Sequence, residues 1–146
     1  MAKITVKDVI YGVENTKYDH HISICNIECD ENDEIIVLPS VFDGKTITHL
    51  GYGQAYEEAH EVWCDWHHPS KGSDWVPAKY LFDYVYFNIP ANVKKIVVPA
   101  TITDINFMAF DRCKGRIEFV FDKDSKYYYQ DHKVYHKECT NLVYKV

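Results

Sequence analysis

The segment HEVWCDWHH, residues 60–68, holds the densest group of side chains in the chain that could do chemistry. Its metal-ligand types are His60, Cys64, His67 and His68. Imidazole nitrogen and thiolate sulfur are ligands that zinc binds readily, so a zinc site is one interpretation. However, the segment lacks the paired CxxC spacing of a structural zinc site. If residues 62–66 form a strand, alternation also points Cys64 and His67 to opposite faces, so zinc remains an alternative.

A nucleophilic thiol is the second chemistry that this segment suggests, because Cys64, Asp65 and His67 are the residue types of a cysteine nucleophile with its base. Such a set is defined by geometry and not by adjacency, and the same alternation separates Cys64 from His67. A second group of ligand types, which also lacks a CxxC pair, consists of His132, His136 and Cys139. We therefore predict no catalytic residue and no cofactor, and we keep a zinc or thiol enzyme built on CDWHH as an alternative.

The composition favours one globular domain and excludes some classes of partner. The chain has 146 residues, of which 47% are hydrophobic, and its formal net charge is −6. A nucleic-acid footprint needs a basic surface, so we expect no direct nucleic-acid binding, although a basic protein partner fits. No apolar run is long enough to span a bilayer, so we expect no membrane partner. The N-terminus shows no apolar signal segment and the five cysteines are an odd number, so we expect reduced thiols in the cytoplasm.

The elements that must position these side chains are marked by an internal repeat. The matching segments are IIVLP at 35–39 with KIVVP at 95–99, ITHL at 47–50 with ITDI at 102–105, and Ala55-Tyr56 with Ala109-Phe110. A third, partial copy overlaps the second, since IPANVKKI at 89–96 matches VPATITDI at 98–105. The first copy carries five extra residues, including the turn DGK. A strand this short cannot stand alone, and the proline ends it because it has no N–H, so we expect the copies to stack.

The spacing A-F-x-x-C-x-x-x-I, from Ala109 to Ile117, resembles the BspA-like leucine-rich repeat family, whose repeat reads roughly L..I.IP..V..I...AF..C. The ending DHKVYHKECTNLVYKV is similar to the terminal hairpin of that family. The repeat and the resemblance together predict a short, β-rich leucine-rich-repeat solenoid with little helix, in a single domain. Its expected parts are an N-terminal capping hairpin at 1–33, repeat units at 34–56 and 89–121, an irregular insertion at 57–88 and a C-terminal capping hairpin at 122–146. Within the first hairpin, alternation puts Ile24 and Ile27 on opposite faces of one strand.

Aromatic residues are the main functional signal, because Tyr and Trp favour binding surfaces and make up most of the 15% aromatic content. Strand alternation points Ile35 outward and predicts an outward row of Val37, Trp63, Tyr84, Tyr86, Val97 and Val120, unless the insertion covers that face and the row is ordinary core. We predict a non-enzymatic protein-binding module, with an alternative as a small acidic intracellular inhibitor, such as an immunity or phage counter-defence protein, that blocks a basic enzyme. The predicted contact residues are Trp63, Asp65, His67, Trp75, Tyr84, Tyr86, Val97 and Val120.

Overall fold

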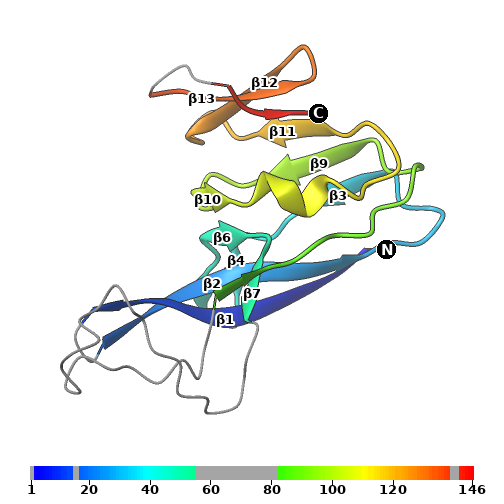
Figure 1. Ribbon diagram of the computed structural model, residues 1–146. Coiled ribbons are helices and arrows are strands. Elements are labelled where there is room, and N and C mark those ends of the chain that lie inside the picture. Colours follow the sequence, from blue (N-terminus) through cyan, green and yellow to red (C-terminus); the bar gives the residue numbers. More distant parts are fainter. Residues whose placement is uncertain (1, 15–16, 55–81, 139–141) are drawn as a thin grey trace, which may run out of the picture.

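The computed structural model describes residues 2–14, 17–54, 82–138 and 142–146. In these residues, β-strands form five small sheets around a common core, which also includes residues of one short 3-10 helix (Figure 1). They contain no α-helix, and no helix among them is long and apolar enough to cross a membrane.

The elements alternate between short repeat strands and antiparallel hairpins. In chain order they are β1 (Lys3–Glu14), β2 (Lys17–Glu28), β3 (Ile35–Val37), β4 (Val41–Phe42), β5 (Lys45–Thr46), β6 (His49–Leu50), β7 (Tyr52–Gln54), β8 (Phe82–Tyr84), β9 (Lys95–Val98), β10 (Asp104–Ile105), the 3-10 helix η3 (Phe107–Phe110), β11 (Glu118–Phe121), β12 (Tyr127–Gln130), β13 (Lys133–His136) and β14 (Leu142–Lys145).

The long N-terminal hairpin β1–β2 contains a β-bulge that corrects the predicted faces. Thr5 pairs with Asn26 but Val6 pairs with Ile24, so Cys25 is an extra residue in β2. An extra residue moves the following side chains to the other face of the strand. As a result, Ile24 and Ile27 are both buried although they are three residues apart.

The two copies of the repeat lie side by side as parallel strands, in the alignment that the sequence predicts. Ile36 of β3 pairs with Ile96 of β9, and Ile96 lies opposite Phe119 of β11. These three side chains point inward and are almost fully buried. A second parallel set joins β2, β6 and β10. The overlapping third copy is also real, because the carbonyls of Pro90 and Pro99 each accept the N–H three residues ahead at 3.2 Å.

The predicted leucine-rich-repeat solenoid is nevertheless wrong. The described residues divide into five separate small sheets, and these do not form one closed solenoid. The parallel sheet β11–β9–β3 stops after three strands, and the set β6–β10 continues into the antiparallel hairpin β1–β2. The physical reason is that β2 of the long antiparallel hairpin pairs with the edge of β6 that a further repeat copy would need. The β-rich content and the scarcity of helix agree with the prediction.

The C-terminal segment adds a three-stranded antiparallel sheet, β12–β13–β14, beyond β11 (Figure 1). Tyr127 of β12 points inward and donates a hydrogen bond from its hydroxyl to the Thr103 carbonyl at 3.0 Å. Phe107 of η3 stacks on Tyr144 of β14 with ring centroids 5.2 Å apart. These aromatic contacts attach the last sheet to the apolar core, which lies between the parallel strands and η3.

Candidate binding surface

The parallel sheet β11–β9–β3 has an outer face that carries a row of three valines. Val37, Val97 and Val120 are paired in register across the three strands, and alternation turns them away from the buried Ile96. Val37 is 67% exposed and Val120 is 36% exposed, while Val97 in the middle is half-buried. Ile35, on the same face of β3, is 56% exposed. We call these four residues, together with Lys95 and Glu118, the outer face.

This exposure is unusual for parallel strands. Parallel sheets are normally covered on both faces, which is why their strands are rich in β-branched residues on both sides. Here Ile36 and Ile96 cover the inner face, but the β-branched residues of the outer face remain accessible to solvent. Contiguous apolar surface of this kind commonly marks a place where another molecule binds.

The hairpin β4–β5 extends the apolar surface just after β3. Its two-residue turn is Asp43-Gly44, and both have positive φ, 50° and 74°, as a type I′ hairpin turn requires. Val41 and Phe42 are 54% and 50% exposed. Two-residue strands have little stability of their own.

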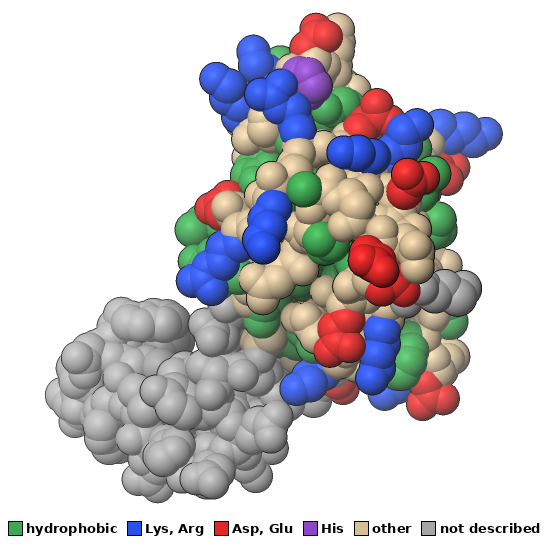
Figure 2. Space-filling view, turned by 90° about the vertical axis from the view of Figure 1, so that its right-hand side faces the viewer, with side chains coloured by type: hydrophobic (Ala, Val, Ile, Leu, Met, Phe, Trp, Pro, Cys, Tyr) green, Lys and Arg blue, Asp and Glu red, His purple; other side chains and the backbone are tan. Residues whose placement is uncertain are grey.

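Charged side chains lie on the outer face and in the turn that precedes it. Lys95 Nζ lies 3.5 Å from Glu118 Oε2 on the face itself, an exposed pair that contributes little stability. Just before β3, the acidic turn 30–34 is held in place by Asn92, whose Nδ2 donates to the carbonyls of Asp30 and Asp33 at 3.0 and 2.7 Å. Figure 2 shows one side of the molecule, on which acidic and basic side chains are intermingled and several Lys and Arg side chains gather near the top.

The structure brings together only part of the predicted contact row. Val97 and Val120 lie on the outer face with Val37. Tyr86 does not join them, because Arg112 lies over its ring at 4.1 Å and the next residue, Phe87, donates its N–H to Ala109 of η3. Outside the described residues are Trp63, Asp65, His67, Trp75, the side chain of Tyr84 and the zinc alternative His60, Cys64, His67 and His68.

The apolar residues that sequence reasoning missed are Val41 and Phe42. The outward direction of Ile35 was predicted, although Ile35 was not among the predicted contact residues, because IIV must expose its first and third residues if it buries its second. Val41 and Phe42 lie in the extra residues of the first repeat copy, next to the DGK turn. An insertion that interrupts a repeat is where a projecting loop is expected.

The described residues show no metal or thiol chemistry. No group of three or more His, Cys, Asp or Glu among them could hold a metal ion. Burial raises the pKa of the Cys113 thiol to about 11, and burial also raises the pKa of Cys25 and Cys29. These thiols are therefore protonated near neutral pH and are poor nucleophiles.

A buried histidine provides a second cluster of polar groups. Ser23, His49 and Asp104 lie in register across β2, β6 and β10, with Asp104 Oδ2 3.4 Å from His49 Nε2. The residue types match a hydrolase triad, but Ser23 is fully buried and its hydroxyl donates to the Tyr52 carbonyl at 2.9 Å. Burial lowers the pKa of His49, whose Nδ1 lies 2.7 Å from the Thr48 hydroxyl. A substrate cannot reach such a serine, so the cluster is structural.

Comparison of the chain with family models, with curated proteins and with solved structures found no match in any of the three. The resemblance to the BspA-like family therefore stays a prediction, and the function is argued from the geometry.

Proposed function

We propose that this chain is a non-enzymatic protein-binding module whose contact surface is the outer face together with the hairpin β4–β5. The observation that carries the proposal is the exposure of β-branched residues on a parallel sheet, above all Val37 at 67% and Ile35 at 56%. Covering such a sheet face removes apolar area from water, which is the main favourable term in protein association.

The apolar and acidic residues of the contact surface indicate which kind of partner would bind it. An apolar centre that is rimmed by charged groups is typical of a protein interface. The acidic turn 30–34 lies directly beside β3, and the chain as a whole carries a net charge of −6. We therefore infer a protein partner with an apolar patch flanked by basic side chains, which acidic residues would attract and orient. A partner that is a basic enzyme would make this chain its inhibitor.

The test begins with capture of partners from a native lysate and their identification by mass spectrometry. The captured protein is then purified, and its dissociation constant is measured by calorimetry for the wild-type chain, Val37→Lys and Met108→Lys. Met108 is the matched control, because it is an apolar residue of similar exposure, 53%, but lies on η3.

We expect Val37→Lys to weaken binding about tenfold or more, because a buried apolar contact at an interface centre is worth roughly 1.4 kcal/mol or more. Met108→Lys should leave the dissociation constant unchanged, and raising the salt concentration should weaken the wild-type complex. Equal affinity of the wild type and Val37→Lys, or loss of binding in Met108→Lys alone, would refute the proposed surface. Inhibition of a captured enzyme in a turnover assay would identify the inhibitor role.

We also propose a cytoplasmic location, with which the free cysteines among the described residues agree. Among the described cysteines, Cys25, Cys29 and Cys113 form no disulfide. Disulfides are rare where glutathione keeps thiols reduced. Alkylation of the protein from its native cells without a reductant, followed by mass spectrometry, should find these thiols reduced, and oxidised cysteines would contradict the location.

A further inference from the structure

A cavity of about 380 Å³ opens between the loop that follows η3 and the last strand, β14. Its size falls in the range of small-molecule sites. The lining residues are Phe110, Asp111, Cys113, Gly115, Arg116, Ile117, Phe119, Tyr144 and Val146. Phe119 and Ile117 belong to the buried side of the parallel sheet, so the cavity is separate from the outer face.

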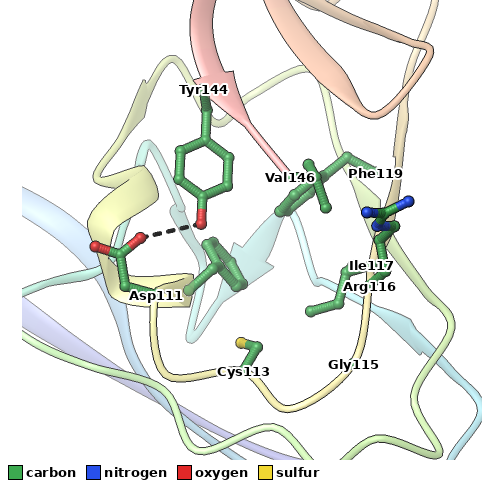
Figure 3. Close-up of a pocket in the computed structure, with 9 residues that line it drawn as sticks. Asp111, Cys113, Gly115, Arg116, Ile117, Phe119, Tyr144 and Val146 are labelled. Atoms are coloured by element: carbon green, nitrogen blue, oxygen red, sulfur yellow. Dashed lines mark hydrogen bonds between the residues drawn. The ribbon is translucent and has the colours of Figure 1, made fainter.

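One wall of the cavity presents a positioned carboxylate. The Tyr144 hydroxyl donates to Asp111 Oδ1 at 3.1 Å (Figure 3). The Tyr144 ring is itself held by its stacking on Phe107. Burial, together with the nearby Asp111, raises the pKa of Tyr144, so its hydroxyl keeps the proton that it donates. No other hydrogen bond to Asp111 is made by a described side chain, which leaves Oδ2 able to accept one from a cationic ligand group.

The opposite wall presents a guanidinium. Figure 3 shows Arg116 across the cavity from Asp111, with Cys113 at the bottom between them. A guanidinium is well suited to bind a carboxylate through two parallel hydrogen bonds, and the charge of Arg116 also acts on the hydroxyl of Tyr129 in β12. The space between the charged walls is lined by Phe110, Ile117 and Phe119, and the Cys113 thiol carries no charge near neutral pH.

We propose that this cavity binds a small zwitterion whose ammonium and carboxylate groups stand at opposite ends of a short apolar chain, as in an ω-amino acid or a dipeptide. The ammonium group pairs with Asp111, the carboxylate pairs with Arg116, and the apolar chain lies against Phe110 and Phe119. An α-amino acid should bind more weakly than an ω-amino acid, because its ammonium and carboxylate groups are both attached to one carbon. Since Asp111 and Arg116 are exposed, we expect affinity in the millimolar range.

The experiment titrates the full chain with ω-amino acids of increasing length, from aminobutanoate to aminooctanoate, and follows amide resonances by NMR. Hexanoate and hexylamine each carry one of the two charged groups and serve as ligand controls. The protein variants are Asp111→Asn and Arg116→Gln, with Arg112→Gln as the matched control, because Arg112 is a neighbouring arginine that lies over Tyr86 outside the cavity. Asparagine can still accept the Tyr144 hydrogen bond, so Asp111→Asn removes the negative charge but preserves the shape of this wall of the cavity.

We expect saturable binding with an optimum at one chain length, and shifts confined to the lining segments 110–119 and 142–146. Removal of either ligand charge, or either cavity variant, should weaken binding about two- to fivefold, because each exposed charge pair contributes little. Arg112→Gln should bind like the wild type.

The inference is overturned if no ligand saturates, if hexanoate or hexylamine binds as well as the zwitterion, or if Arg112→Gln weakens binding as much as Arg116→Gln. Denaturation midpoints of the variants show whether each is folded. None of these outcomes depends on Val37 or on a protein partner, so this inference and the proposed function stand or fall separately.

Discussion

The turn at Gly51 offers a quantitative test of how the two repeat copies are joined. Gly51 has a φ of +90°, and a Cβ added there would lie 2.9 Å from the Asn106 carbonyl oxygen and 3.0 Å from the Ala109 Cβ. Its own carbonyl accepts the Asn106 side-chain amide at 3.0 Å. Gly51→Ala therefore combines a strained backbone with overpacking against the second copy.

The matched control is Gly44→Ala in the hairpin turn. Gly44 also has a positive φ, +74°, but an added Cβ meets nothing within 4 Å. The backbone penalty for either alanine is about 1–2 kcal/mol. Overpacking in a well-packed region adds roughly 1–3 kcal/mol, and this part applies to Gly51 alone. The lower flexibility of alanine in the unfolded chain affects both variants alike, so it cancels in the comparison.

We therefore expect Gly51→Ala to lower the free energy of unfolding by about 2–5 kcal/mol and Gly44→Ala by about 1–2 kcal/mol. Urea denaturation measures both values, provided that the m-value stays unchanged. If the two variants agree within about 0.5 kcal/mol, the scale of a neutral surface change, the close approach of Gly51 to Asn106 and Ala109 is not a feature of the folded chain.

Two further predictions concern titrating groups. Because burial lowers the pKa of His49 below its ordinary value of 6.5, the unfolded chain takes up this proton first as the pH falls, and the free energy of unfolding should decrease below about pH 6.5. His49→Gln should reduce that pH dependence in urea titrations, and an unchanged slope would contradict the burial of a neutral imidazole. Burial holds the pKa of Cys113 at about 11 rather than 9.0, so alkylation near pH 8 should be roughly 100-fold slower than for a model thiol. A rate equal to that of the model thiol, measured by mass spectrometry, would show that Cys113 is more accessible than the structure indicates.

The strand ends and the pairing of the repeats could be predicted from local chemistry. A proline cannot donate to a ladder, and β3 ends two residues before Pro39 while β9 ends directly before Pro99. Matching the prolines places Ile36 opposite Ile96, which is the observed register. The outward direction of Val97 and Val120 follows from the same alternation.

The bulge at Cys25 could not be predicted, because the alternation of side chains in β2 gives no sign of it. Its position depends on β1, where Thr5 and Val6 must both keep partners while Ile24 and Ile27 enter one core. The place of Tyr86 depends in the same way on a distant element, since the N–H of Phe87 pairs with Ala109 of η3. The cavity also needs tertiary structure, because Tyr144 and Asp111 are 33 residues apart in the chain.

By itself, the sequence determined the β-rich character of the domain, the stacking of equivalent repeat strands and the alternation that exposes the valine row. These features depend on the proline positions and on a period of two, which are properties of short segments. Only the tertiary structure decided that the copies do not continue into a solenoid, that the extra residues fold out as β4–β5, and that a carboxylate and a guanidinium face each other across a cavity. Those outcomes depend on which distant segments compete for the same core and the same strand edges, and local chemistry does not encode that competition.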